Sequence, residues 1–287
     1  STRPTLSVPR LPTMGHPLFQ MTDAQYQIVY DFLSFTFAAM AASTLFFWLR
    51  LSSIAEKYKS ALAITGLVTF IAAYHYLRIF NSWTDAYKYA PAIKSNDTYS
   101  VANELIVTGT PFNDAYRYMD WLLTVPLLLV EIILVMDLSE NETFEKSWKL
   151  GSAAALMIIL GYPGELILEQ DKLGTRWVFW TLAMIPFVYI VYTLVIGLSQ
   201  ATNAEPDANI RKSIRTAQYM TVISWLTYPI VYIIPMMGAK GANAVVGIQL
   251  GYCLSDIISK CGVGFLIYNI SNAKSKAMSK GLLQNNI

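Results

Sequence analysis

Two ionisable residues, Asp256 and Lys260, lie in the middle of the apolar stretch Gly251–Ile270, which reads GYCLSDIISKCGVGFLIYNI. They are four residues apart, the spacing at which side chains on one helix face meet. A buried lysine without a partner tends to lose its proton, whereas a nearby carboxylate favours its charged form. Lysine amines also condense with carbonyl compounds to form Schiff bases. The pair therefore predicts a buried cationic amine that can carry a covalently bound carbonyl compound.

A second apolar segment, Tyr116–Met136, carries Arg117, Asp120, Thr124 and Glu131. At about 100° per residue, these four side chains fall within about 60° of one another on a helix. Asp120 and Glu131 are then about 16 Å apart along the axis, roughly half the thickness of a bilayer core. Each residue also has a simpler structural explanation when taken alone. Arg117 could be a helix-end residue whose side chain reaches the membrane interface, and Glu131 could form an ion pair with a lysine that only supports packing. However, all four residues share one helix face, and another segment carries its own acid–lysine pair. Together these features favour a functional role for the intramembrane charges, with Asp120 and Asp256 both facing Lys260.

The composition indicates an integral membrane protein. Of 287 residues, 54% are hydrophobic and only 14% are charged, against roughly 25% charged residues in soluble domains. A net charge of +2 without a basic cluster argues against nucleic-acid binding. Cys253 and Cys261, in a chain with only two histidines, offer no zinc-binding pattern, so we expect no metal site.

Seven segments are long and apolar enough to cross a bilayer, which takes about 20 residues each. They are Tyr26–Leu49, Ala61–Phe80, Tyr116–Met136, Lys149–Leu168, Arg176–Leu198, Ala217–Met236 and Ala244–Ile270. The expected fold is an all-α membrane protein, a seven-transmembrane-helix bundle over 23–271, with an extracellular arm over 1–22 and a cytoplasmic tail over 272–287. Alternation in TYSVANELIVTG, between the second and third segments, predicts a short β-hairpin.

The positive-inside rule gives the orientation, because flanking Lys and Arg residues concentrate on the cytoplasmic side. With the amino terminus outside, the inner flanks hold eleven of these residues and the outer flanks seven, or eight with Arg78. We therefore expect an extracellular amino terminus and a cytoplasmic carboxy terminus.

Several motifs resemble those of the microbial rhodopsins along essentially the whole chain. RYMDWLLTVPLLLVE is similar to their third helix, SWLTYPIVY to their sixth, and SDIISK to the segment that carries the retinal lysine. AAYHYLRIFNSW, NDAYRYMDWLLTVPLLLVE and GYPGE look closest to the xanthorhodopsin-like branch, near the proteorhodopsins.

This resemblance implies a role for each ionisable residue. All-trans-retinal is bound to Lys260 as a protonated Schiff base, Asp120 is the primary counterion and proton acceptor, and Asp256 is the second counterion. Glu131 matches the proton donor, and its apolar surroundings LLLVEIILV favour a protonated carboxyl group. Arg117 and Thr124 match residues that support the counterion cluster. The Asp–Thr–Glu pattern at 120, 124 and 131 is that of outward proton pumps.

The resemblance also predicts the chromophore pocket, which should be narrow and lined by aromatic side chains. The expected lining residues are Trp121, Val125, Leu128, Met157, Gly161, Trp180, Phe187, Trp225, Tyr228, Pro229, Tyr232 and Ser259. From the sequence alone, such aromatic residues more often face lipid or fill a core. Leu128 matches a colour-tuning position, where leucine goes with green absorption.

Two residues carry finer expectations. His75 matches a histidine that pairs with the primary acid in this branch, and we predict a His75–Asp120 pair that controls the protonation of Asp120. Trp180 stands where some xanthorhodopsin-like pumps have a glycine that admits a carotenoid. An indole would close that opening, so we expect no carotenoid antenna.

The sequence thus predicts a light-driven outward proton pump of the cell membrane, an ion transporter rather than an enzyme. Its partners would be the lipid bilayer, protons and, as in related proteins, further copies in a homo-oligomer. Alternatives are a sensory rhodopsin that signals to a transducer, a light-driven pump of another cation, and a chromophore-free seven-helix transporter. Glu131 favours a pump over a sensor, because a sensor needs no efficient proton donor.

Overall fold

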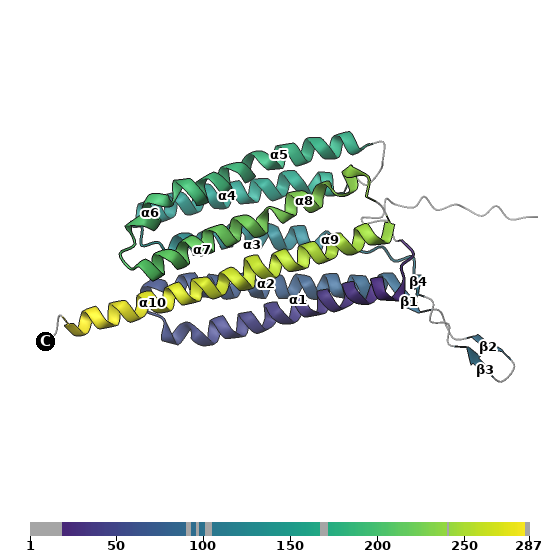
Figure 1. The fold of residues 1–287 in the computed structure, drawn as a ribbon, viewed down its shortest axis with the longest axis horizontal. Coiled ribbons are helices and arrows are strands. Elements are labelled where there is room, and N and C mark those ends of the chain that lie inside the picture. The colour runs from purple at the N-terminus through teal and green to yellow at the C-terminus, as the bar shows by residue number, and fades with distance from the viewer. Residues whose placement is uncertain are drawn as a thin grey trace, which may run out of the picture.

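The computed structural model describes residues 19–89, 93–95, 98–100, 105–166, 172–239 and 241–284. Seven helical rods run side by side and form the predicted seven-helix bundle (Figure 1). The first four are α1 (Asp23–Arg50) with η1 (Leu51–Ser53), α2 (Glu56–Ala86), α3 (Tyr116–Leu134) and α4 (Glu140–Glu165). The fifth comprises α5 (Leu173–Tyr192), the π-helical η3 (Thr193–Gly197) and α6 (Ser199–Ala204). The sixth comprises α7 (Ala208–Trp225), α8 (Thr227–Ile233) and η4 (Pro235–Met237), and the seventh α9 (Gly241–Asp256), the π-helical η5 (Ile257–Gly262) and α10 (Val263–Gln284).

Short antiparallel strands lie between α2 and α3, which confirms the predicted hairpin in this connection. β1 (Tyr87–Tyr89) pairs antiparallel with β4 (Leu105–Val107), and β2 (Ile93–Ser95) with β3 (Thr98–Ser100). The stretch TYSVANELIVTG supplies β3 and β4, and the partners of both strands come from the residues before it. We call this the sheet end of the bundle and the opposite end, where α10 finishes, the tail end (Figure 1).

Local sequence signals explain where several helices begin and break. Thr22 and Ser139 form capping boxes with Gln25 and Glu142, which satisfy the first free backbone N–H groups of α1 and α4. The sixth rod breaks between α7 and α8, where Pro229 removes a backbone donor. The helices extend beyond the predicted apolar segments, and α10 continues past residue 271 to Gln284, so much of the expected tail is helical.

The distribution of side chains is that of a membrane protein. Large apolar side chains such as Phe35, Leu49 and Ile185 are exposed on the outer surface, where lipid is the solvent that suits them. Four described helices are long and apolar enough to span a membrane by composition alone: those over Asp23–Ser53, Glu56–Ala86, Leu173–Ala204 and Gly241–Gly281. α3 also crosses the bundle, but Arg117, Asp120 and Glu131 lower its hydropathy.

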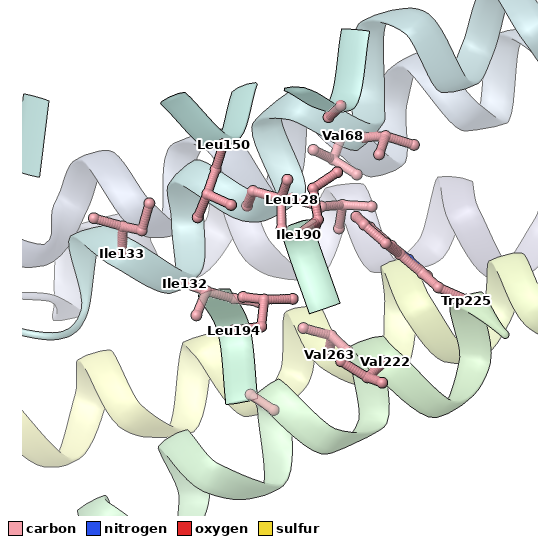
Figure 2. Packing of buried hydrophobic residues seen from close by; sticks show 14 of the residues in the cluster. Val68, Leu128, Ile132, Ile133, Leu150, Ile190, Leu194, Val222, Trp225 and Val263 are labelled. Atoms are coloured by element: carbon pink, nitrogen blue, oxygen red, sulfur yellow. The ribbon is translucent and has the colours of Figure 1, made fainter. Parts of the chain in front are cut away.

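The interior contains a large apolar cluster to which most of the rods contribute. Figure 2 shows part of it, with Leu128 and Ile132 of α3, Leu194 of η3, and Val222 and Trp225 of α7 packed together. Such dense packing fixes the rods relative to one another. The ionisable residues described next are embedded in this interior.

Candidate functional site

Lys260 lies at the centre of the bundle, with only 1% of its side chain exposed. It belongs to the π-helical turn η5, which interrupts the seventh rod between α9 and α10. Single π-helical turns inside helices are frequent at functional sites. The Nζ atom lies 2.7 Å from Oδ1 of Asp256 and 3.1 Å from Oδ2 of Asp120. The structure therefore brings the lysine together with an acid of its own rod and an acid of α3.

The two carboxylates beside Lys260 have very different surroundings. Asp256 accepts hydrogen bonds from the hydroxyl groups of Tyr76 at 2.7 Å and Tyr228 at 2.5 Å, and from Nε1 of Trp121 at 3.3 Å. Neither carboxylate oxygen of Asp120 accepts a hydrogen bond with good geometry from a described residue, although Lys260 is within ion-pair distance of it. Hydrogen bonds to a carboxylate stabilise its charged form. The surroundings therefore favour the charged form of Asp256 more strongly than that of Asp120.

A chain of buried hydrogen bonds continues from Asp256 toward the sheet end. Arg117 donates from Nη1 to the hydroxyl oxygen of Tyr76 at 2.8 Å and from Nε to Oδ1 of Asp114 at 2.5 Å. It also donates to Gln249, whose Nε2 donates to Oδ2 of Asp114 at 2.9 Å. The chain thus connects Lys260, through Asp256 and Tyr76, with a carboxylate on the sheet-end side of Arg117.

Glu131 lies on the other side of Lys260, toward the tail end, and is fully buried. Thr65 of α2 donates a hydrogen bond to its Oε2 at 2.8 Å, and Oε1 has no partner among the described residues. A single neutral donor is weak compensation for a buried carboxylate. The surroundings therefore favour the protonated carboxyl group, as the apolar sequence around Glu131 predicts.

An apolar cavity adjoins the two carboxylates, and its aromatic and aliphatic lining is typical of small-molecule pockets. Of the predicted pocket residues it is lined by Trp121, Val125, Met157, Gly161, Trp180, Phe187, Trp225, Tyr228, Pro229 and Tyr232. Leu128 and Ser259 are buried but do not line it. Because Trp121 and Tyr228 line the cavity and also bond to Asp256, the Lys260 amine lies at its edge. The arrangement suits a rigid apolar molecule attached to Lys260.

Comparisons with known proteins agree with this geometry. A sequence profile of the bacteriorhodopsin-like protein family matches residues 30–273. The chain is 28% identical over 238 residues to the green-light absorbing proteorhodopsin of Gamma-proteobacterium EBAC31A08, covering 83% of this chain and 84% of that protein. Among solved structures, xanthorhodopsin, described as a light-driven ion pump with dual chromophore, is 42% identical with a TM-score of 0.81, covering 92% of this chain and 99% of the other. Thermophilic rhodopsin is 40% identical with a TM-score of 0.81, covering 91% and 99%.

The chain is a microbial rhodopsin. It belongs to the bacteriorhodopsin-like family of light-driven ion pumps and is a multi-pass membrane protein, not an enzyme. Membership of the rhodopsins also implies retinal, and the apolar, aromatic lining of the cavity beside Lys260 suits such a molecule.

Two predicted supporting residues of this rhodopsin make other contacts than expected. Thr124 donates to the backbone carbonyl of Asp120 at 2.8 Å, not to a carboxylate. His75 has Nδ1 2.9 Å from the carbonyl oxygen of Ile71, and no hydrogen bond to Asp120 occurs among the described contacts. The predicted His75–Asp120 pair therefore stays a prediction.

Sequence reasoning missed several residues that surround the rhodopsin site. Tyr76, Asp114 and Gln249 extend the hydrogen-bond chain, Thr65 contacts Glu131, and Tyr118 and Tyr252 line the cavity. The spacing of two of these residues could have indicated their position. Asp114 is three residues before Arg117, and Gln249 is seven residues before Asp256, and both spacings place side chains on one face of a helix. Thr65 left none, since threonines in apolar helices commonly bond to their own backbone.

Proposed function

We propose that this rhodopsin is a light-driven outward proton pump with all-trans-retinal attached to Lys260. The observation that carries the proposal is the contrast between the two acids at the lysine. Asp256 accepts three further hydrogen bonds, whereas neither oxygen of Asp120 accepts one from the described residues. A pump needs one acid that keeps its charge and one that can take up a proton, and the two surroundings differ in that sense.

Retinal bound to Lys260 as a Schiff base supplies light absorption, a change of shape on illumination, and a nitrogen that carries a dissociable proton. The protein supplies the remaining functions. Trp121, Trp225 and Tyr228 line the apolar cavity, and their rings favour an apolar molecule there over water. Asp256 balances the positive charge at Nζ from 2.7 Å and remains an anion.

Asp120 serves as the proton acceptor, because its Oδ2 lies 3.1 Å from Nζ of Lys260. The hydrogen-bond chain through Tyr76, Arg117 and Asp114 leads from this region to the sheet end. A proton that reaches Asp120 thus has a polar environment on that side, which supports release toward the sheet end.

Glu131 serves as the proton donor. It is buried on the tail-end side of Lys260, eleven residues after Asp120, about 16 Å along the helix. After Asp120 has accepted the proton, Glu131 returns one to Lys260 and is refilled from the tail end. With the acceptor and the donor on opposite sides of Lys260, each cycle moves one proton toward the sheet end.

The distribution of basic residues supports an extracellular sheet end and a cytoplasmic tail end. Eleven Lys and Arg residues flank the tail end against seven or eight on the sheet-end side. Transport toward the sheet end is then transport out of the cell. Assembly into a homo-oligomer stays a prediction from the resemblance.

The absence of a carotenoid antenna is a further part of the proposal. Trp180 lines the cavity, and its Nε1 donates a hydrogen bond to the carbonyl oxygen of Pro229 at 3.1 Å. The indole therefore bridges α5 and α8 at the place where a carotenoid would approach the ring of retinal. Xanthorhodopsin itself carries two chromophores. Energy transfer from an added carotenoid to retinal would contradict this part of the proposal.

Light-driven pH changes in cells that express the protein with retinal test the function directly. We expect acidification of the medium on illumination that an uncoupler abolishes. Uptake of protons that an uncoupler enhances and that requires sodium would indicate a sodium pump instead. A coloured, photoactive protein without any pH change would indicate a photosensor. Lys260→Ala serves as the control and should give a colourless protein.

A further inference from the structure

A partly buried ion cluster lies at the tail end of the bundle, and neither the proposed acceptor nor the proposed donor belongs to it. Lys274 of α10 is only 4% exposed, and its Nζ lies 2.5 Å from Asp137 and 2.7 Å from Glu205. Asp137 also pairs with Lys57 at 2.5 Å and accepts a hydrogen bond from Tyr58 at 2.9 Å. We call these five residues the tail cluster. It joins the start of α2, the α3–α4 connection, the α6–α7 connection and α10.

The backbone at Asp137 shows that the cluster fixes its chain segment. Asp137 has a φ of +54° and is the only non-glycine residue with positive φ in the described part of the chain. This left-handed conformation is uncommon outside glycine, although Asp tolerates it better than most residues. The contacts with Lys57, Tyr58 and Lys274 hold Asp137 in place, so the cluster constrains the end of the helix that carries Glu131.

The tail cluster lies directly beyond Glu131. Tyr58 and Thr65 are seven residues apart on α2 and share one face, because seven residues make nearly two helical turns. Thr65 bonds to Glu131, and Tyr58 bonds to Asp137, about 10 Å farther along the helix. Between these two levels lie the buried apolar side chains of Ala61 on α2 and Val135 after α3. Along this face of α2, the tail cluster and the apolar layer therefore separate Glu131 from the tail-end solution.

The sixth rod connects the cluster to the cavity. Trp225, the last residue of α7, lines the cavity and is 2% exposed. Glu205 lies three residues before the first residue of the same helix. The 18 residues of α7 form a rod about 27 Å long, which runs from the α6–α7 connection to α8 (Figure 1). The rod thus provides a direct mechanical connection between the cavity and the Glu205–Lys274 ion pair.

We propose that Lys274 is a positioning residue for proton uptake, and that separation of Lys274 from Glu205 admits the proton that refills Glu131. This inference rests on the proposed pump function. In the resting state, Lys274 holds the α6–α7 connection against the α3–α4 connection and keeps water from Glu131. When α7 moves, Glu205 leaves Lys274, while Asp137 retains Lys57 and Lys274 as partners. The apolar layer can then hydrate from the tail end.

Flash photolysis of the purified protein with a pH-indicator dye tests this inference in three variants. Glu205→Gln removes one charge of the pair and should accelerate proton uptake about fivefold, which corresponds to about 1 kcal/mol. Lys274→Met should act in the same direction, and Lys274→Arg, which keeps both ion pairs, should restore uptake close to the wild-type rate. The earlier proton transfer from Lys260 to Asp120 should be unchanged in all three. A general loss of structure would alter both steps.

The matched control is Lys276→Ala, since Lys276 is exposed on the same helix two residues farther on. It should leave uptake unchanged. Amide hydrogen exchange in the dark gives a second readout that needs no light reaction. Glu205→Gln should increase exchange in the α6–α7 connection and the first turn of α7, and Lys276→Ala should not.

Unchanged or slower uptake in Glu205→Gln, or an equal acceleration in Lys276→Ala, would overturn the inference. If Lys274→Met does not fold, the uptake rates of Glu205→Gln and Lys274→Arg still test the inference. In both variants Asp137 keeps a basic partner at position 274, so the rest of the tail cluster remains paired. Failure of the pump function would show differently, as a wild-type protein that gives no uncoupler-sensitive pH change. If the protein pumps normally but the rate of proton uptake does not respond to these substitutions, the proposed role of Lys274 is rejected and the pump function stands.

Discussion

The two halves of the bundle on either side of Lys260 differ in how many hydrogen bonds their buried polar side chains make. On the sheet-end side, Tyr76, Arg117, Asp114 and Gln249 form a continuous chain of buried hydrogen bonds. On the tail-end side, Glu131 has one hydrogen bond, from Thr65, and is followed by an apolar layer. Protons move readily along polar contacts and poorly through apolar packing. In the proposed function the sheet-end half is the exit side and the tail-end half the entry side. The comparison then predicts that the exit side is ready for proton transfer in the resting state, whereas the entry side has to open first.

The largest expected effect comes from removing the acceptor. Asp120→Asn should abolish light-driven transport, since Asn cannot take up the proton from Lys260. Asp256, with three hydrogen bonds besides its ion pair, cannot replace it. The measurement is external pH under illumination, together with the absorbance change that reports loss of the proton from Lys260. Asp85→Asn, an exposed carboxylate at the sheet end, is the matched control and should pump normally. Residual transport in Asp120→Asn would show that the contrast between the two acids was misread.

Removing the donor should slow the cycle without stopping its first step. We expect Glu131→Gln to slow the return of a proton to Lys260 by about 100-fold, in the range of contributions by a positioned acid. Transfer to Asp120 should keep its rate, because that step occurs on the other side of Lys260. Transient absorption separates the two steps, and a small permeant weak acid should restore the slow one. Equal slowing of both steps would contradict the division of the bundle into an entry and an exit half.

The same contrast shows what the sequence could and could not predict. The seven rods, the pairing of Asp256 with Lys260 and the approach of Asp120 follow from hydropathy, helical spacing and family motifs. The hydrogen bonds that distinguish Asp120 from Asp256 come from Tyr76 and Tyr228, on two other rods, and their side-chain directions depend on packing that spacing cannot supply. The sequence did not predict the tail cluster for the same reason. Its charged residues Lys57, Asp137, Glu205 and Lys274 are far apart in the sequence, and each one alone looks like an ordinary exposed charge. The sequence predicted strands between α2 and α3, but it did not predict that β3 and β4 pair with earlier strands, because alternation identifies strands and not their partners.

On the exit side, Asp114→Asn should destabilise the protein by about 3–5 kcal/mol, the effect of leaving one partner of a buried ion pair behind. Arg117 is 1% exposed and would lose the carboxylate 2.5 Å from its Nε. The measurement is chemical or thermal unfolding followed by the loss of the visible absorption. Asp85→Asn again serves as the control. A stability loss below about 1 kcal/mol, the usual value of an exposed pair, would show that Arg117 does not depend on this carboxylate.

On the entry side, Thr65→Val should slow proton return to Lys260 by about fivefold, in line with the loss of one hydrogen bond to a group that becomes charged. The Thr65 hydroxyl donates to Oε2 of Glu131 at 2.8 Å and would stabilise the carboxylate formed after proton transfer. Valine keeps the shape and removes only the hydroxyl group. Thr69→Val, one turn along the same helix and bonded to Thr44, is the matched control. Faster proton return in Thr65→Val would mean that the hydroxyl group holds the proton on Glu131 instead of assisting its departure.

The smallest effect concerns the pH dependence of stability at the tail end. Burial alone would raise the pKa of Asp137, but hydrogen bonds from Lys274, Lys57 and Tyr58 outweigh it and lower the pKa below its usual value. A carboxyl group with a lowered pKa in the folded state contributes stability above its unfolded pKa of about 3.9 and loses it as the pH falls through the folded value. Asp137→Asn should therefore have a Tm a few degrees below that of the wild type near neutral pH. For a protein of this size, each kcal/mol of lost stability lowers the Tm by about 2–4 °C. This difference in Tm should shrink as the pH falls below about 4.

Asp207→Asn is the control for this pH series, because Asp207 caps α7 at the same end and takes no part in the tail cluster. Its Tm difference from wild type should not follow the same profile, since its carboxylate accepts backbone hydrogen bonds from Asn209 and Ile210 that an Asn side chain can also accept. A Tm difference for Asp137→Asn that stays constant from neutral pH to pH about 3 would mean that its charge contributes nothing. The tail cluster would then hold its segments by packing alone, and the closed entry half would depend on the apolar layer around Ala61 and Val135 without help from ion pairs.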